Sequence, residues 1–156
     1  MSTDAIVVLR ADHTAVRTLF REFEEASAAA HRTRGLVVAR IIELLTVHTW
    51  LENECLYPEL QALVPGLEAA ILESYEEHHI AEVLMAELAV MSPGDARFTA
   101  KTRVLIEHVE QHMDEEENTL FPRMREHLGR KQLQDVGARM LELRARTGGR
   151  TPAPLP

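Results

Sequence analysis

The chain is poor in several residue types whose abundance marks particular classes of protein. It contains 7 glycines and 7 prolines among 156 residues, and 46% of its residues are hydrophobic, which excludes collagen-like, low-complexity and wholly disordered chains. Its single cysteine, Cys55, has no second cysteine with which to form an internal disulfide bond. A chain of this length is typical of one globular domain, in which folding hides about 70% of the unfolded surface.

The sequence also has no excess of basic charge and no long apolar run. Lysine and arginine number 17 against 25 acidic residues, and the resulting net charge of -8 repels phosphate backbones, so we expect no nucleic-acid partner. No run approaches the about 20 apolar residues that cross a bilayer, so we expect no membrane span. Asp4 and Arg10 flank only a short apolar stretch near the N-terminus, so no signal peptide is visible and we predict a cytoplasmic protein.

What the sequence does contain is helical periodicity. Apolar residues recur at spacings of 3, 4 and 7 in long segments, and no strand pattern competes with them. Gly35 separates the first segment from the second, and Pro58 and Pro122 fall inside the second and fourth, where each is expected to kink its helix. The predicted helices cover residues 4–30, 36–63, 67–91 and 96–127.

Short turns join these helices, so neighbouring helices are expected to run antiparallel. We therefore predict an all-α protein, with an up-down-up-down four-helix bundle over residues 1–128. Apolar residues at helical spacing predict a short additional C-terminal helix in residues 129–146, and the glycine- and proline-rich residues 147–156 predict a flexible tail.

Histidines and acidic residues interrupt the apolar stripe of all four helices. Burial of an unpaired carboxylate costs several kcal/mol or forces it to take up a proton, so carboxylates that converge in one core need a counter-charge. Arg17 offers one positive charge, whereas a pair of divalent or trivalent metal ions neutralises all of them, with neutral imidazoles completing the ligand sets. The residues on these stripes are His13, His48, Glu52, His78, Glu82, His108, His112 and Glu116.

The pattern of histidine and glutamate occurs twice in the chain. A spacing of four residues places the two side chains about 6 Å apart on one helix face, so both reach the same ion. Such a repeat predicts two helical hairpins on one plan, with one metal ion in each half of a dinuclear site. His48-x3-Glu52-x4-Tyr57-Pro58 matches His112-x3-Glu116-x4-Phe121-Pro122 at an offset of 64 residues, and Asp12-His13 matches Glu77-His78 at an offset of 65.

These residues and spacings resemble the hemerythrin-like, or HHE cation-binding, family over residues 5–127. The resemblance implies a bundle that holds two iron ions, joined by oxo or hydroxo and carboxylate bridges. A small molecule such as hydrogen peroxide, O2 or nitric oxide then binds or reacts, and any catalytic chemistry is expected at the di-iron centre itself. Carried over by position, the implied ligands are His13, His48, Glu52, His78, His112 and Glu116, and the apolar stripe adds Glu82.

Two departures from the family's oxygen carriers bear on function. Those proteins have a second histidine one turn after the third-helix ligand, where this chain has Glu82, and an acid five residues after the fourth-helix histidine, which is Glu117 rather than Glu116. A carboxylate-rich site favours the ferric state and reactive chemistry over reversible oxygen carriage. We therefore expect catalase-like decomposition of hydrogen peroxide, which is attributed to some compact members of actinobacterial type. The alternative is a non-catalytic protein that binds or senses O2, nitric oxide or iron.

Several residues keep two interpretations. Glu82 either bridges the metal ions or forms an ion pair with Arg17, and either Glu116 or Glu117 is the ligand. His108 is expected to support a ligand or to pack in the core.

Aromatic residues and the C-terminal helix leave further alternatives. Tyr57 and Phe121 are interpreted as packing residues, and Tyr75 as either a packing residue or a hydrogen-bond donor to a bound oxygen species. No protein partner is evident, although residues 130–146 offer the surface that a sensor needs. A metal-free bundle and a zinc site are also considered, but a bridged site with vacant positions suits iron better than zinc.

Overall fold

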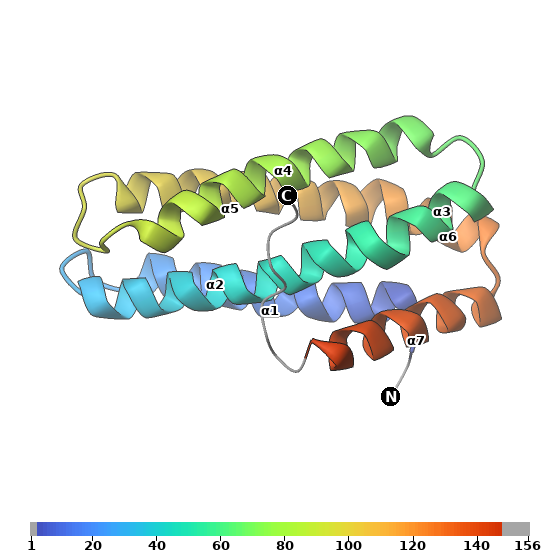
Figure 1. Cartoon of the computed structure of the whole chain (residues 1–156), viewed down its shortest axis with the longest axis horizontal. Helices are drawn as coiled ribbons and strands as arrows, with labels where there is room; N and C mark the ends of the chain where they lie inside the picture. Colours follow the sequence, from blue (N-terminus) through green and yellow to red (C-terminus); the bar gives the residue numbers. More distant parts are fainter. Residues whose placement is uncertain (1–2, 148–156) are drawn as a thin grey trace.

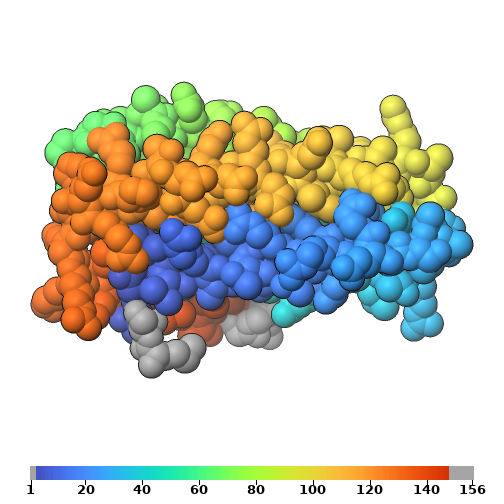
Figure 2. All heavy atoms as spheres, turned by 180° about the vertical axis from the view of Figure 1, so that it is seen from behind, coloured from blue at the N-terminus to red at the C-terminus, as the bar shows by residue number. Residues whose placement is uncertain are grey.

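The structure, a computed structural model, describes residues 3–147, and every regular element in that range is a helix (Figure 1). Four helical rods lie alongside one another and alternate in direction, which confirms the predicted up-down-up-down bundle. Seen from behind, α1 and α5 lie side by side along one face (Figure 2). The elements are α1 (Ala5–Glu25), α2 (His31–Leu51), the π-helix η1 (Glu52–Leu56), α3 (Tyr57–Leu63), α4 (Glu68–Val90), α5 (Phe98–Glu115), the π-helix η2 (Glu116–Leu120), α6 (Phe121–His127) and α7 (Arg130–Arg146).

Local chemistry accounts for the start of α1 and for the turn before α4. Asp4 caps α1, since its Oδ1 accepts a hydrogen bond from the Ile6 backbone N–H at 2.8 Å. Gly66, in the turn before α4, has a φ of 83°, a backbone angle that favours glycine. Residues 148–156 of the predicted flexible tail lie outside the residues that the structure describes. None of the helices within residues 3–147 is long and apolar enough to cross a membrane.

The prediction that Gly35 separates two helices is wrong, because Gly35 lies inside α2. A Cβ atom at Gly35 would lie 2.6 Å from Cγ of Pro93. The missing side chain therefore lets the loop after α4 lie against α2, and glycine is required here for close approach rather than for ending a helix.

The kinks expected at Pro58 and Pro122 take the form of π-helical turns. In η1 the backbone N–H of Tyr57 donates to the carbonyl of Glu52, and in η2 that of Phe121 donates to Glu116, five residues back in each case. Proline follows directly and has no N–H to continue the regular ladder. Each wide turn thus begins at a glutamate of the repeated motif, and π-helical turns are frequent at functional sites.

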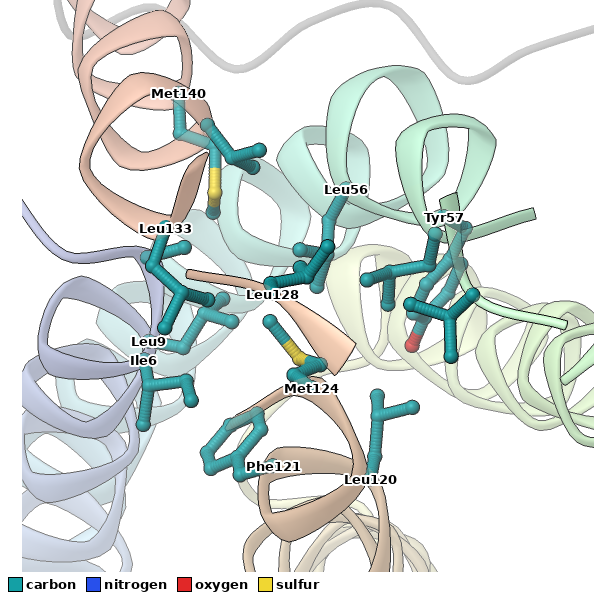
Figure 3. Packing of buried hydrophobic residues seen from close by; sticks show 14 of the residues in the cluster. Ile6, Leu9, Leu56, Tyr57, Leu120, Phe121, Met124, Leu128, Leu133 and Met140 are labelled. Atoms are coloured by element: carbon teal, nitrogen blue, oxygen red, sulfur yellow. The ribbon is translucent and has the colours of Figure 1, made fainter. Parts of the chain in front are cut away.

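Two apolar clusters fill the two ends of the bundle. One surrounds Phe20, Phe23 and Phe98, and the other gathers side chains of α1, η1, α6 and α7 (Figure 3). Along α1, Leu9 belongs to the cluster in Figure 3 and Val16 to the other, with His13 between them. The second and third rods likewise pass from one cluster to the other at His48 and His78, and the fourth does so at Glu116, between Met113 and Leu120. The polar residues therefore lie in the middle of the core.

The C-terminal helix α7 is part of this core. Leu133 and Met140 are buried and point toward Ile6, Leu9 and Leu56 (Figure 3). Gly137 of α7 is also buried, and a Cβ atom there would lie only 1.5 Å from the carbonyl oxygen of Thr3. The backbone before α1 thus rests directly on α7, which fixes the position of this helix.

We predict that Gly137→Ala destabilises the protein although alanine is the better helix former. The added methyl group collides with backbone, and overpacking of this kind costs about 1 to 3 kcal/mol of unfolding free energy in urea denaturation. Gly129→Ala is the matched control, because its Cβ meets only the Gln132 side chain at 3.8 Å. Unchanged stability of Gly137→Ala would contradict this close approach.

Candidate metal centre

Six of the seven predicted ligands meet in the middle of the bundle. They form two groups, and the candidate ligand atoms within each group lie within 4.8 Å of one another. All six side chains are buried. The first group is His13, His48 and Glu116, and the second is Glu52, His78 and His112.

The two groups adjoin each other through their carboxylates. Glu116 Oε1 lies 3.3 Å from His13 Nε2 and 3.3 Å from His112 Nε2, so it faces histidines of both groups. Glu52 belongs to the second group, yet its Oε1 is 2.5 Å from His48 Nε2 of the first. The glutamates are therefore positioned between the two groups, as carboxylates shared by two cations would be.

The Nδ1 atom of each of the four histidines in the two groups faces an acceptor that belongs to neither group. His13 contacts Glu117 Oε1 at 2.9 Å and His48 contacts Asp12 Oδ2 at 2.9 Å. His78 contacts Asn53 Oδ1 at 2.7 Å, and His112 contacts Glu77. A carboxylate or amide oxygen in this place makes Nδ1 the donor, which leaves the lone pair of Nε2 directed inward for a metal ion.

These four acceptors follow the internal repeat. Asp12 and Glu77 each precede the first histidine of a hairpin, and Asn53 and Glu117 each follow the motif glutamate. The equivalence of the Asp12 and Glu77 positions is visible in the sequence, but their hydrogen-bond partners depend on helix packing. Glu117, the alternative ligand, thus orients His13 instead of joining either group.

Several inward atoms have no hydrogen-bond partner among the described residues. They are His13 Nε2, His48 Nε2, Glu52 Oε1 and Glu116 Oε1, all buried. Although His48 Nε2 and Glu52 Oε1 are close, their contact lacks hydrogen-bond geometry. Buried polar atoms are normally paired, so this set of convergent nitrogen and oxygen donors fits a metal cation.

The electrostatics also fit a cation. Burial lowers the pKa of His13 to about 4 and that of His78 to about 3, so both imidazoles are neutral at pH 7. Burial opposes the charge on His48 too, but the carboxylates of Glu52 and Asp12 raise its pKa to about 10. Burial and the neighbouring Glu52 raise the pKa of Glu116. In the metal-free protein, His48 therefore holds a proton at pH 7 that a metal ion would displace, and Glu116 is protonated more readily than an ordinary glutamate.

Tyr57 is a site residue that the sequence reading assigned to packing. Its hydroxyl donates to Glu52 Oε2 at 2.8 Å and lies 3.5 Å from Glu116 Oε2, at complete burial. The equivalent position in the second half is Phe121, whose ring stacks on His13 with centroids 5.8 Å apart. The signal in the sequence was this difference between tyrosine and phenylalanine at matched positions of the repeat.

The structure does not bring Glu82 to the cluster. Its side chain is exposed on α4, where Ala81 and Met85 face the core instead. The alternative ion pair with Arg17 is also wrong, because Arg17 contacts Glu110, Asp114 and Glu117. Both predicted interpretations of Glu82 are therefore wrong, because the core-facing positions of α4 beside it are taken by Ala81 and Met85.

His108 and Tyr75, which each had two interpretations from the sequence, lie near the groups. His108 Nε2 contacts the backbone carbonyl of Glu77 at 2.8 Å, so it supports the segment that carries His78. Tyr75 donates to the carbonyl of Asn53 at 3.4 Å and packs edge-on against Tyr57.

A cleft reaches the cluster from the surface between α4 and η2. It has a volume of about 270 Å³, and its wall includes His112 and Glu116 together with Glu73, Glu77 and Glu115. A second cavity of about 20 Å³, beside His48 and His78, has room for about one water molecule. The cleft is therefore the wider approach of the two for a small solute.

Comparison with known proteins identifies the family. A profile of the hemerythrin HHE cation binding domain matches residues 4–124. The chain belongs to the hemerythrin HHE cation-binding family. This confirms the resemblance seen in the sequence, and the convergent donors described above lie within the matched residues.

Two relatives of this hemerythrin HHE domain illustrate its range. The crystal structure of an HHE cation-binding domain-containing protein from Mycobacterium kansasii superposes with a TM-score of 0.79, over 94% of this chain and 88% of that one. The two sequences are 22% identical, and the structural match shows a shared fold. A protein of Nostoc sp. (strain PCC 7120) named DNA nickase is 28% identical over 146 residues, or 91% of this chain. The chain spans only 40% of the length of that relative.

We predict that removal of the Tyr57 hydroxyl destabilises the metal-free domain. Tyr57→Phe leaves buried Glu52 Oε2 without its donor, which costs about 1 to 3 kcal/mol of unfolding free energy. Tyr75→Phe is the control, because its hydroxyl is only partly buried and its bond is longer, so its effect is expected to be smaller. Equal effects in urea unfolding would contradict the special position of Tyr57.

We also predict that divalent metal binding releases protons and strengthens as pH rises. His48 holds a proton in the metal-free protein, and because the metal ion must displace it, the metal affinity is expected to rise by up to about tenfold per pH unit. Calorimetry with Co²⁺ in buffers of different ionisation enthalpy measures the number released. Glu82→Gln, which changes an exposed residue, is the control and should release the same number of protons as the wild type. Binding of Co²⁺ without proton release by both proteins would contradict the protonation assigned to the metal-free cluster.

Proposed function

We propose that this hemerythrin HHE protein is a non-haem di-iron protein that decomposes hydrogen peroxide. The donor chemistry supports this assignment, since imidazole and carboxylate suit iron and the absence of a thiolate in either group argues against a soft-metal site. The proposed ligands are His13, His48, Glu52, His78, His112 and Glu116.

The strongest support is the pairing of the two donor groups. Each has two histidines and a glutamate, and both glutamates lie between the groups. A single structural cation would need only one such group. Two adjacent groups could hold a pair of irons. Such a pair, when bound, would supply the two-electron exchange that a small oxidant requires.

The protein's own residues control what arrives and where protons are held. The cleft is lined by Glu73, Glu77 and Glu115 against a single arginine, Arg123, so its acidic excess favours a neutral or cationic solute over an anion, and hydrogen peroxide is neutral. At the cluster, the Tyr57 hydroxyl holds a proton against Glu52 Oε2.

A sensor that binds O2 or nitric oxide without turnover is the second candidate. One contact favours it: Arg144 of α7 donates to Asp12 Oδ2, which accepts from His48 Nδ1. This contact joins the outermost helix to the donor cluster and offers a route by which the state of the centre alters the surface of α7.

DNA cleavage is not supported by this chain. The name of the cyanobacterial relative describes a protein of which this chain spans 40% of the length. The net charge of -8 and the acidic cleft both repel a phosphate backbone.

The decisive experiment measures iron content and peroxide turnover on the protein purified from iron-replete cells. We expect two irons per chain and oxygen release when hydrogen peroxide is added. His112→Ala is expected to retain one iron and to lose most of the oxygen release, because it removes a donor of the second group. Glu82→Gln is the matched control and is expected to retain both irons and full turnover, since its side chain is exposed.

The outcomes separate the candidates. Two irons without oxygen release would favour the sensor. Absence of stoichiometric metal, or retention of both irons by His112→Ala, would overturn the proposed ligand set.

A further inference from the structure

We propose that the two metal positions differ in how firmly they hold their ions, although their ligands are equivalent by sequence. The position formed by His13, His48 and Glu116, here the anchored position, retains its ion. The position formed by Glu52, His78 and His112, here the cleft position, exchanges its ion with solution. This inference rests on the metal binding proposed above and assigns each position a different task.

At the anchored position, an arginine holds the carboxylate behind each histidine. Glu117 accepts from His13 and is gripped by Arg17, with Nη1 at 2.8 Å from Oε1 and Nη2 at 3.2 Å from Oε2. Asp12 Oδ2 accepts both from His48 Nδ1 at 2.9 Å and from Arg144 Nη2 at 2.5 Å.

The arginines are themselves held by the fold. Arg17 also donates to Glu110 and Asp114 of α5, so it joins α1 to that helix. Arg144 belongs to α7, which is docked through Gly137 and its buried apolar residues. The acceptor of His13 is thus held by an arginine that α5 also binds, and the acceptor of His48 by an arginine of α7.

At the cleft position, the corresponding acceptors lack this support. His78 faces Asn53, a neutral amide, and a neutral acceptor makes a hydrogen bond roughly half as strong as an ionised one. His112 faces Glu77, which has no arginine among its hydrogen-bond and ion-pair partners within residues 3–147. The Glu77 side chain is 26% exposed, against 17% for both Asp12 and Glu117.

Solvent also reaches the two positions unequally. The cleft of about 270 Å³ is lined by Glu77, His112 and Glu116 but not by His13 or His48. His112 is the most exposed of the four histidines at 7%, whereas His13 is at 0%. The cleft therefore reaches one histidine of the cleft position and the shared carboxylate Glu116, but neither histidine of the anchored position.

Release of a metal ion requires an imidazole to turn away from it, so the hydrogen bond behind the imidazole sets part of the barrier. An arginine withdraws some charge from the carboxylate, but it prevents the carboxylate from moving with the ring. Loss of an outer partner of a ligating histidine typically weakens metal binding by about 10-fold to 100-fold. The anchored carboxylates should therefore slow release specifically from the first position.

The test is metal release from full-length protein loaded with two equivalents of Co²⁺ and mixed with an excess of a chromogenic chelator. We expect two phases of one ion each. Arg144→Gln is expected to accelerate the slow phase about tenfold and to leave the fast phase unchanged. Arg146→Gln is the matched control on the same helix, because within residues 3–147 Arg146 forms an ion pair only with the exposed Glu142. The control should change neither phase.

Variants of the cleft position test the assignment from the other side. Glu77→Gln is expected to accelerate only the fast phase, and Asn53→Asp, which gives His78 an ionised acceptor, to slow it. Arg144→Lys keeps the charge and should retain part of the slow release. The absorption spectrum of bound Co²⁺ reports separately whether each position is occupied.

Each result is decisive. Failure to bind Co²⁺ at all would overturn the proposed metal centre itself. Binding of two ions with release in a single phase, or acceleration of both phases by Arg144→Gln, would leave the metal centre standing and overturn the inequivalence. If Arg144→Gln does not fold, as judged by circular dichroism, the opposite shifts expected of Glu77→Gln and Asn53→Asp decide the question.

Discussion

The burial of two carboxylates side by side is the constraint on which the rest of this bundle depends. Glu52 and Glu116 are removed from water in the middle of the core, where burial and the neighbouring Glu52 raise the pKa of Glu116. Burial of such charge without compensation costs several kcal/mol. The nearby imidazoles, the Tyr57 hydroxyl and the proposed cations all reduce this cost, so the loss of any one of them affects the others.

Local backbone structure places the two glutamates. Each begins a π-helical turn, and the regular helix that resumes directly after the turn has a proline as its second residue. Apolar clusters on both sides of the polar layer supply the favourable burial that keeps the four rods together. The bundle therefore concentrates its stability at its ends and its chemistry in the middle.

The internal repeat makes the ligands alike while leaving their surroundings free to differ. Asn53 and Glu117 occupy matched positions, but one is a neutral amide and the other an ionised acceptor held by Arg17. Tyr57 and Phe121 are matched as well, and only the tyrosine donates to a glutamate. Such differences between halves give two chemically distinct positions from one duplicated plan, with α7 contributing Arg144 to the first of them.

The sequence by itself determined the helices, the duplicated plan and the six histidines and glutamates that converge, because helical periodicity and spacing are local properties of the chain. It predicted α7 at residues 130–146, where the structure has it. Tertiary structure alone decided which neighbours surround those six. Glu82 follows His78 by four residues, as Glu52 follows His48, yet it is exposed, because the packing of α4 against its neighbours turns Ala81 and Met85 toward the core. The direction of the Tyr57 hydroxyl and the partners of each Nδ1 atom likewise depend on contacts between residues far apart in the chain, which no local pattern encodes.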